Sequence, residues 1–158
     1  MKARTSATSE NGEPVLMFQL AGKNFALDLT RVEQVLDFCP PTPTPRRPPN
    51  IEGIIQHRGR FLAVTALRKR LGVTEPGPAR PPIVLLTGIG PDPVLGLLVD
   101  QVFRVLTLAR DAVLPPPPRV FGIRAEFIRG VANAAGHPLV WLDAAKLLGS
   151  AEPVTLLA

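Results

Sequence analysis

The sequence predicts an all-β fold made of two similar units with about five short strands each. Its apolar residues come in short runs separated by Gly and Pro, a pattern typical of strands and not of long helices. The segment 51–72 (IEGIIQHRGRFLAVTALRKRLG) also returns 77 residues later as 128–149 (IRGVANAAGHPLVWLDAAKLLG), with Ile, Gly, Leu and Lys positions matched. The chain is therefore predicted to be a duplicated unit.

A second internal match supports the duplication. Residues 25–36 (FALDLTRVEQVL) align with 95–106 (LGLLVDQVFRVL). In each half, this segment comes before that half's copy of the 51–72 repeat. A sheet of short, curved strands best satisfies the backbone hydrogen-bonding groups at its edges by closing into a small barrel. Two barrels side by side leave a groove between them, and that groove is the default binding surface. The aligned apolar pairs are Leu27/Leu97, Val32/Val102, Val35/Val105 and Leu36/Leu106.

The first half begins with an expected hairpin. Runs 15–21 and 25–29 have strand length and are joined by a Gly-containing turn. Thr30 is expected to cap one helical turn, with Val32 and Val35 on its apolar side. The Pro-rich segment 39–50 then predicts an extended surface crossing, because Pro fixes φ and removes amide donors.

The first copy of the repeat is expected to be a hairpin followed by a helix. Strands 51–59 and 60–67 meet at Arg58, Gly59 and Arg60, where Gly59 supplies a turn that a residue with a Cβ atom would resist. Residues 68–72 predict one or two helical turns ended by Gly.

The second half restarts the pattern after the Pro-rich and Gly-rich linker 73–82. Strands are expected at 82–88, 94–100 and 101–108, with a turn at 90–93. A run of prolines, 115–118, then precedes the second copy of the repeat.

The domain boundaries follow from this pattern. We predict a flexible N-terminus over 1–14, a folded region over 15–150 and a tail over 151–158, which is left open between packing and fraying. The folded region divides into subdomains at about 15–75 and about 82–150, with exchange of residues between the two barrels allowed.

Charge is concentrated in one part of the chain. The net charge is +5, and residues 46–80 hold eight basic and two acidic side chains. Such a surplus favours an acidic partner, either a protein or a nucleic acid, and a solvated face is the alternative. No apolar run reaches the roughly 18 residues of a membrane span, so we expect a cytoplasmic protein without direct membrane insertion.

The residues show no motif for catalysis. Phosphate-binding loops, nucleophile elbows and paired acids are absent from the sequence, and its single cysteine excludes an internal disulfide. We therefore expect no catalytic residue, no cofactor and no metal site. Cys39 is expected to be a small buried group, Trp141 a core residue and His57 a surface polar residue.

The ordered set of segments resembles the CheW-like domain of bacterial chemosensory systems over residues 14–150. It runs from FQLAGKNFALDLTRVEQVL through the Pro-rich crossing, IEGIIQHRGRFLAVTALRKRLG, GLLVDQVFRVLTL and PPP to FIRGVANAAGHPLVWLDAAKLL. The resemblance implies two pseudo-symmetric SH3-like five-stranded barrels with a few short helices. It also implies a stand-alone, non-enzymatic scaffold that couples the cytoplasmic domain of chemoreceptors to the regulatory domain of a CheA-type histidine kinase, recruited to receptor arrays.

The resemblance also places a binding surface. The RG turn of the family falls on Arg58 and Gly59, the position associated with receptor contact, and a guanidinium on a rigid hairpin tip suits that role. A solvated turn arginine is the alternative, and for the apolar positions the alternative is plain core. The remaining predicted partner-binding residues are Val32, Gln34, Val35, Gly53, Leu98 and Val99.

Several positions depart from the family pattern. The family usually reads NLRG where this chain has QHRG, and it has an acidic residue at Gln34, Pro at Ala63 and Asp at Ala66. These changes, with added arginines at 46, 47 and 60, make the first barrel unusually basic. They motivate two alternatives: a diverged adaptor that has lost one interface and recruits a specific receptor or other protein, and a basic nucleic-acid-binding barrel. Nucleic acid is not the expected partner, because the basic residues are not interleaved with aromatic ones.

Overall fold

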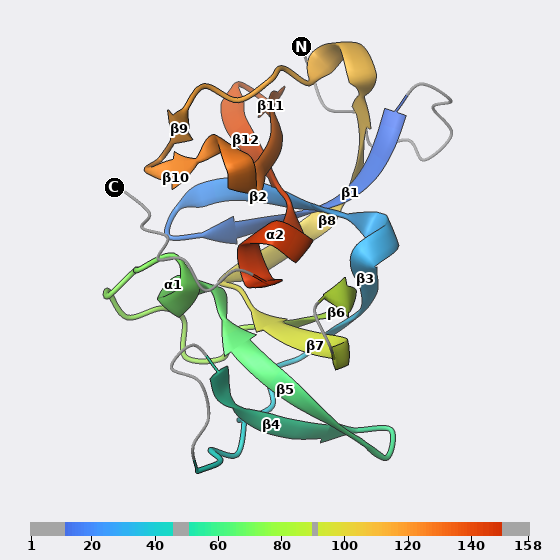
Figure 1. Ribbon diagram of the computed structural model, residues 1–158, viewed down its shortest axis with the longest axis vertical. Helices are drawn as coiled ribbons and strands as arrows, with labels where there is room; N and C mark the ends of the chain where they lie inside the picture. Colours follow the sequence, from blue (N-terminus) through green and yellow to red (C-terminus); the bar gives the residue numbers. More distant parts are fainter. Residues whose placement is uncertain (1–11, 46–50, 90–91, 150–158) are drawn as a thin grey trace.

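The computed structural model describes residues 12–45, 51–89 and 92–149. Most of the predicted flexible N-terminus and the whole predicted tail lie outside these residues, although the first strand already begins at Gly12. In the described segments the strands form two five-stranded sheets and a short two-stranded ribbon (Figure 1).

The first half of the chain holds β1 (Gly12–Leu20), β2 (Lys23–Asp28), η1 (Leu29–Arg31), β3 (Val32–Leu36), β4 (Ile51–His57), β5 (Arg60–Ala66) and α1 (Leu67–Arg70). The second half holds β6 (Ile83–Ile89), β7 (Asp92–Leu98), β8 (Gln101–Ala109), η2 (Arg110–Ala112), β9 (Arg119–Val120), β10 (Ile123–Arg124), η3 (Ala125–Phe127), β11 (Ile128–Ala134), β12 (His137–Leu142) and α2 (Ala144–Gly149).

Both large sheets have the same strand order, built from equivalent strands. The first sheet runs β11-β12-β2-β1-β8 and the second runs β4-β5-β7-β6-β3. Even the register repeats: β12 pairs with β2 in parallel through Val140 and Phe25, and β5 pairs with β7 in parallel through Ala63 and Leu95. The all-β prediction of two pseudo-symmetric five-stranded units is confirmed, although hydrogen bonding does not close either sheet into a complete barrel.

Each sheet takes strands from both halves of the chain. Strands β1 and β2 pair with β8 and β12, while β3, β4 and β5 stand in the sheet that contains β6 and β7. The two sheets are therefore interleaved, and their division does not follow the linker at the middle of the sequence.

The repeated glycine of each half lies where a crossing segment meets its sheet. An added Cβ on Gly53 would lie 2.3 Å from the backbone oxygen of Thr42, and one on Gly130 would lie 2.3 Å from Cγ1 of Val113. An isolated bridge joins Thr42 to Ile54, and the equivalent bridge joins Leu114 to Val131. The glycines therefore let the Pro-rich crossings approach β4 and β11 closely.

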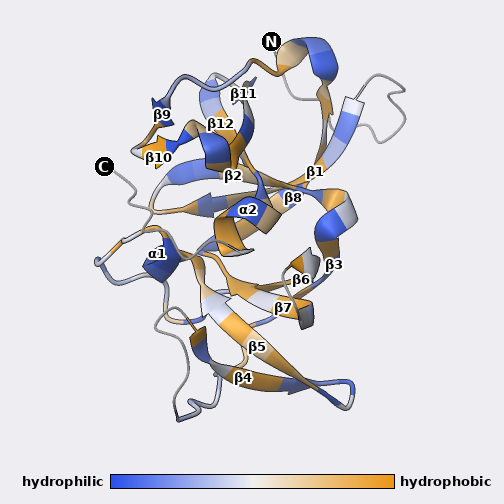
Figure 2. Ribbon diagram, viewed as in Figure 1, coloured by the Kyte–Doolittle hydropathy of each residue, from blue (hydrophilic) through white to orange (hydrophobic). Residues whose placement is uncertain are grey.

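The main hydrophobic core lies between the two sheets and includes both α-helices. It contains Phe18 and Phe25 of the first sheet, stacked with ring centroids 5.7 Å apart, and Val84 of the second. Leu67 of α1 and Leu147 of α2 complete it. Figure 2 shows the apolar residues concentrated on the strands, as expected for a core made by facing sheets.

Two local expectations were wrong. The helical turn near Thr30 is η1, and it ends at Arg31, so Val32 and Val35 lie on β3. These β-branched residues pair with Leu86 and Val84 of β6, which satisfies their backbone groups in a ladder. Cys39 is exposed and not buried, because it is the first residue of the Pro-rich crossing on the surface.

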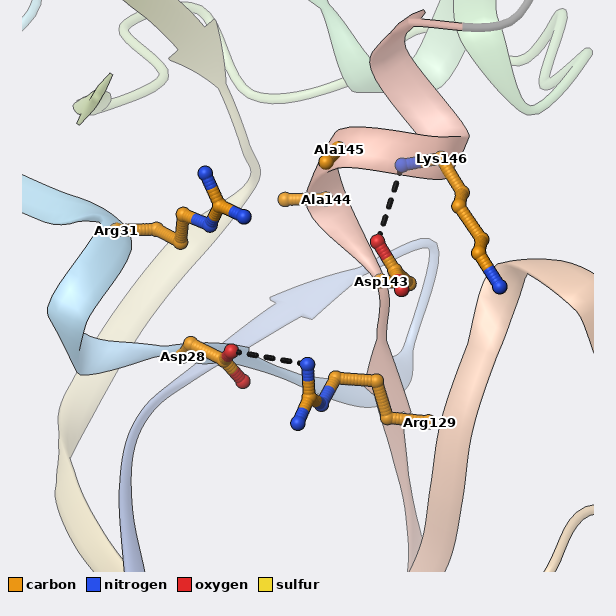
Figure 3. Close-up of a pocket in the computed structure, with 7 residues that line it drawn as sticks. All are labelled: Asp28, Arg31, Arg129, Asp143, Ala144, Ala145 and Lys146. Atoms are coloured by element: carbon orange, nitrogen blue, oxygen red, sulfur yellow. Dashed lines mark hydrogen bonds and ion pairs between the residues drawn. The ribbon is translucent and has the colours of Figure 1, made fainter. Parts of the chain in front are cut away.

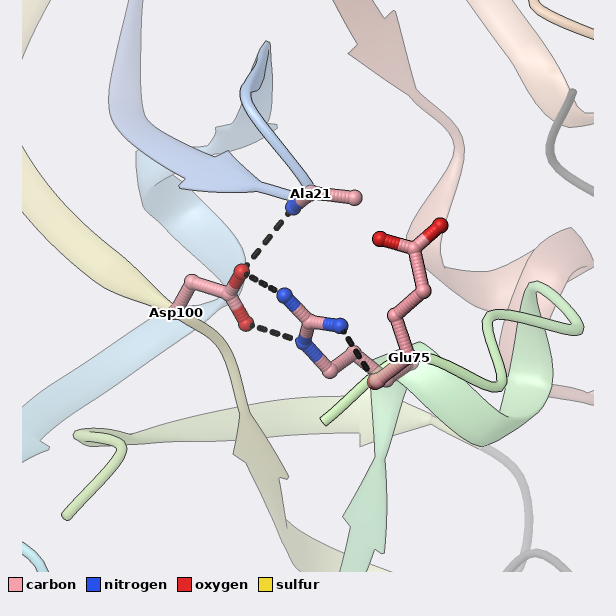
Figure 4. A network of polar contacts seen from close by, with 4 residues as sticks. Ala21, Glu75 and Asp100 are labelled. Atoms are coloured by element: carbon pink, nitrogen blue, oxygen red, sulfur yellow. Dashed lines mark hydrogen bonds and ion pairs between the residues drawn. The ribbon is translucent and has the colours of Figure 1, made fainter. Parts of the chain in front are cut away.

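Two arginines of the α1 region connect distant parts of the chain. Arg68 donates from Nε and Nη2 to the two carboxylate oxygens of Asp100, at 2.7 and 2.6 Å, and Asp100 also accepts the N–H of Ala21 at 2.9 Å (Figure 4). The hydrogen bonds that Arg68 donates to Asp100 raise the pKa of Arg68. Arg70 is buried and donates to the carbonyl oxygen of Leu147 in α2 at 2.8 Å. These contacts connect α1 to the β1–β2 turn, to the β7–β8 turn and to α2.

Candidate functional surface

The β4–β5 turn holds an arginine in a strained backbone conformation. Arg58 and Gly59 have φ values of 51° and 75°, as a two-residue turn between twisted strands requires. The guanidinium of Arg58 makes no hydrogen bond or ion pair with the described residues, and its side chain is exposed. The equivalent turn of the second half has the same geometry but carries Ala135 and Gly136. Only the first half presents a cation there.

Two polar contacts hold the base of this turn against β3. Arg60 donates to Glu33 at 2.9 Å, and His57 shares a hydrogen bond with Gln34 at 3.3 Å. Gln34 is therefore half-buried beside the hairpin, and Arg58 follows His57 directly. The structure thus brings Gln34 of β3 to the base of the β4–β5 turn.

The two valines of β3 differ in exposure. Val32 is half-buried and packs against the main core, while Val35 is 40% exposed. Glu33 stands in a β-bulge between Val32 and Gln34, which locally twists the strand. The edge strand β3 therefore keeps the apolar side chain of Val35 exposed to solvent.

Exposed apolar residues on β8 were missed by the sequence interpretation. Val105 is 39% exposed and Phe103 is 40% exposed on this edge strand of the first sheet. Val102 packs against the same core as Val32. The internal alignment already paired Val35 with Val105, so it could have identified this second edge. Phe61, next to Arg60 on β5, is 71% exposed, and no comparable pattern in the sequence indicated this exposure.

The other predicted residues lie elsewhere. Ala66 pairs with Leu98, so Leu98 lies beside the far end of β5, about six residues or roughly 20 Å from Arg60 at the hairpin end of that strand. Leu98 is half-buried and lines a 120 Å³ cavity with Ala66 and Arg68. Val99 is only 1% exposed and belongs to the core, and Gly53 packs under the crossing segment.

Four of the eight basic residues of segment 46–80 are paired or buried within the molecule. Arg60 pairs with Glu33, Arg68 with Asp100 and Lys69 with Glu52, while Arg70 is buried against Leu147. Arg46 and Arg47 lie outside the described residues. Among the described residues of this segment, the unpaired positive surface is therefore smaller than the charge count of the sequence suggested.

The described residues contain no group of three or more side chains suited to hold a metal ion. Among the helices of the described segments, none has the length and apolar character needed to cross a membrane.

Comparison with known proteins identifies the family. The CheW-like domain model matches residues 14–152. Chemotaxis protein CheW of Treponema pallidum is 27% identical over 150 residues, which is 92% of this chain and 88% of that protein. Protein FrzA of Myxococcus xanthus is 35% identical over 116 residues, 70% of this chain and 69% of FrzA.

A solved structure shares the fold. The scaffolding protein TtCheW from Thermoanaerobacter tengcongensis superimposes with a TM-score of 0.78 at 28% identity, covering 92% of this chain and 99% of that one. The resemblance inferred from the ordered segments is thus confirmed. This chain belongs to the CheW-like domain family.

Proposed function

We propose that this chain is a non-enzymatic coupling adaptor of a bacterial chemosensory pathway. It joins the cytoplasmic domain of a chemoreceptor to the regulatory domain of a CheA-type histidine kinase, acting in the cytoplasm within receptor arrays. The family match across residues 14–152 carries this proposal. It is supported by a likeness to a protein described as a scaffold over 92% of the chain.

The receptor contact is proposed at the surface around the β4–β5 turn. A helical receptor segment would lay apolar side chains against Val35 of β3. Arg58, free of partners among the described residues, would donate to acidic or amide groups at the rim. Leu98, Val99 and Gly53 would then support the partner surfaces from within the fold, since Val99 and Gly53 are buried.

A co-purification experiment tests the adaptor function. The folded protein is immobilised and offered a receptor cytoplasmic fragment and a kinase regulatory-domain fragment, separately and together. We expect both to be retained, and the receptor to be retained with the kinase. Retention of neither fragment by correctly folded protein would contradict the proposal.

Arg58→Ala is expected to weaken receptor binding by about 1 to 3 kcal/mol, because the bound partner loses charge-assisted hydrogen bonds. Arg58→Lys should recover only part of this loss, since a lysine keeps the charge but not the planar fork. Isothermal titration with the receptor fragment measures both changes. Arg110→Ala removes an exposed arginine from η2 and serves as the control. If the wild type and Arg58→Ala bound the receptor fragment with equal affinity, Arg58 would not be part of the receptor contact.

The departures from the family pattern support a second candidate, an adaptor that keeps only one interface. The side chain of Gln34 is hydrogen-bonded to His57 within the molecule. Ala66 has no carboxylate, whereas the equivalent residue of the second half is Asp143. The same fragments separate the two candidates. Binding of the kinase without the receptor, or the reverse, would favour the diverged adaptor.

The nucleic-acid alternative finds no support in the structure or the comparisons. Four basic residues of the segment that motivated it are paired with acids or with a backbone carbonyl, as described above. Phosphate binding needs free cations whose counterions are released, so paired ones contribute little.

A further inference from the structure

A charged pocket lies on the first sheet, apart from the Arg58 surface. It has a volume of 170 Å³ and is open to solvent between the end of β2, the start of β11 and α2 (Figure 3). Its lining residues are Asp28, Arg31, Arg129, Asp143, Ala144, Ala145 and Lys146. Three cations from three separate elements therefore face two carboxylates in one small space.

The two carboxylates of the pocket are already used by internal donors. Asp28 accepts the indole N–H of Trp141 at 2.6 Å on Oδ1 and pairs with Arg129 at 3.3 Å on Oδ2. Asp143 accepts the backbone N–H of Lys146 at 3.0 Å. The pocket is therefore lined by three cations and two carboxylates, which is a formal surplus of one positive charge.

The cations keep unused donors. Arg31 donates a hydrogen bond from Nη1 to the carbonyl oxygen of Gly88 at 2.8 Å, and Figure 3 shows its guanidinium directed toward Ala144. The ammonium of Lys146 has no acceptor and no ion-pair partner among the described residues. Three donors on an ammonium and the free N–H groups of a guanidinium are therefore available to an anion.

The internal repeat shows what is missing from this pocket. In the first half, Lys69 pairs with Glu52 at 2.5 Å. The equivalent residues of the second half are Lys146 and Arg129, so the carboxylate of the first half is replaced by a second cation. Glu52 and Arg129 even occupy the same β-bulge position. Arg129 pairs with Asp28 instead, so Lys146 lacks, among the described residues, the ion-pair partner that Lys69 has.

A second internal contact also differs between the halves. In the first half the guanidinium of Arg68 binds both carboxylate oxygens of Asp100. The equivalent residues of the second half are Ala145 and Thr30, while Asp28 and Asp143 stand where the first half has Leu98 and Ala66. The second half therefore exchanges two carboxylates for two others and gains one cation in this place.

We propose that this pocket binds the carboxylate of an acidic side chain on a partner protein, between Lys146, Arg31 and Arg129. A singly charged carboxylate suits the site better than a phosphate dianion, because Asp28 and Asp143 stand close by and repel a second negative charge more strongly. The proposal goes beyond the receptor and kinase contacts. Its test uses neither protein and can fail while the co-purification succeeds.

Trp141 reports on the pocket. It is the single tryptophan of the chain, its indole donates to Asp28, and Arg129 lies over its ring at 4.8 Å. Its indole N–H signal in a proton–nitrogen correlation spectrum is therefore followed while a blocked triglutamate peptide is added. We expect a saturable shift that weakens at higher salt, and no shift with a blocked triglutamine peptide.

Matched variants make the test specific. Lys146→Gln and Arg31→Gln should each weaken triglutamate binding about five- to tenfold, and Lys146→Glu should abolish it. Lys69→Gln, which changes the equivalent lysine of the first half, should leave the affinity unchanged. The proposal is overturned if triglutamate causes no shift, if triglutamine shifts the signal equally, if inorganic phosphate binds more tightly than the peptide, or if Lys69→Gln weakens binding as much as Lys146→Gln.

Discussion

Gly53→Ala is expected to lower the free energy of unfolding by about 3 to 5 kcal/mol, a large part of the stability of a domain this size. The added Cβ would lie 2.3 Å from the backbone oxygen of Thr42, an atom that cannot rotate away. The φ of Gly53 is also +154°, a conformation that residues with side chains rarely adopt. Relief requires the crossing segment to move, which breaks the hydrogen bonds between Thr42 and Ile54 at 2.8 and 2.9 Å.

Urea unfolding followed by circular dichroism measures this effect, with other glycines as controls. Gly149→Ala adds a Cβ that meets nothing within 4 Å and should leave the stability nearly unchanged. Gly130→Ala should cost an intermediate amount, about 1 to 3 kcal/mol, because its nearest obstacle is a side-chain methyl of Val113 and not a backbone oxygen. If Gly53→Ala proved as stable as Gly149→Ala, the close approach of the crossing would be disproved.

Asp100→Ala is expected to lower the free energy of unfolding by about 2 to 4 kcal/mol. The substitution leaves the guanidinium of Arg68 and the N–H of Ala21 without their acceptor in a partly shielded place. The loss should exceed that of Arg68→Met, which removes the charge together with its desolvation cost. In the double variant the losses should be less than additive, because the two residues form one interaction.

An exposed ion pair provides the comparison for Asp100. Glu13 and Arg110 lie 3.5 Å apart and are both exposed, so Glu13→Gln should change the stability by less than about 0.5 kcal/mol. The same urea unfolding experiment measures both variants. A cost for Asp100→Ala as small as that for Glu13→Gln would show that the network does not stabilise the junction.

The candidate surface was only partly predictable from the sequence. Arg58 and Gly59 could be placed, because Gly between two strand-length runs specifies a tight turn and its neighbour must then point outward. The exposure of Val35 and the burial of Val99 could not, because both are apolar residues in apolar runs. Which of them faces solvent depends on what packs above each strand, and that information lies in distant segments.

The charged pocket shows the same limit. The sequence aligns Arg129 with Glu52 and Ala145 with Arg68, so the changed charges were visible in the repeat. Their meaning depended on the ion pairs of the first half, which join residues distant in sequence, such as Arg68 and Asp100. The spacing of apolar residues along the sequence carries no information about such contacts.

The duplicated all-β unit can be recognised from the amino-acid sequence, because strand-length apolar runs and turn-forming glycines act locally and recur in order. The interleaving of the two sheets, with β1 and β2 paired to β8 and β12 of the other half, follows from the three-dimensional fold and not from any local pattern. Equivalent strands offer nearly the same backbone hydrogen bonds and apolar faces within either half. The choice between them rests on long-range packing, in which the crossings, the glycines beneath them and the Arg68–Asp100 junction favour one arrangement.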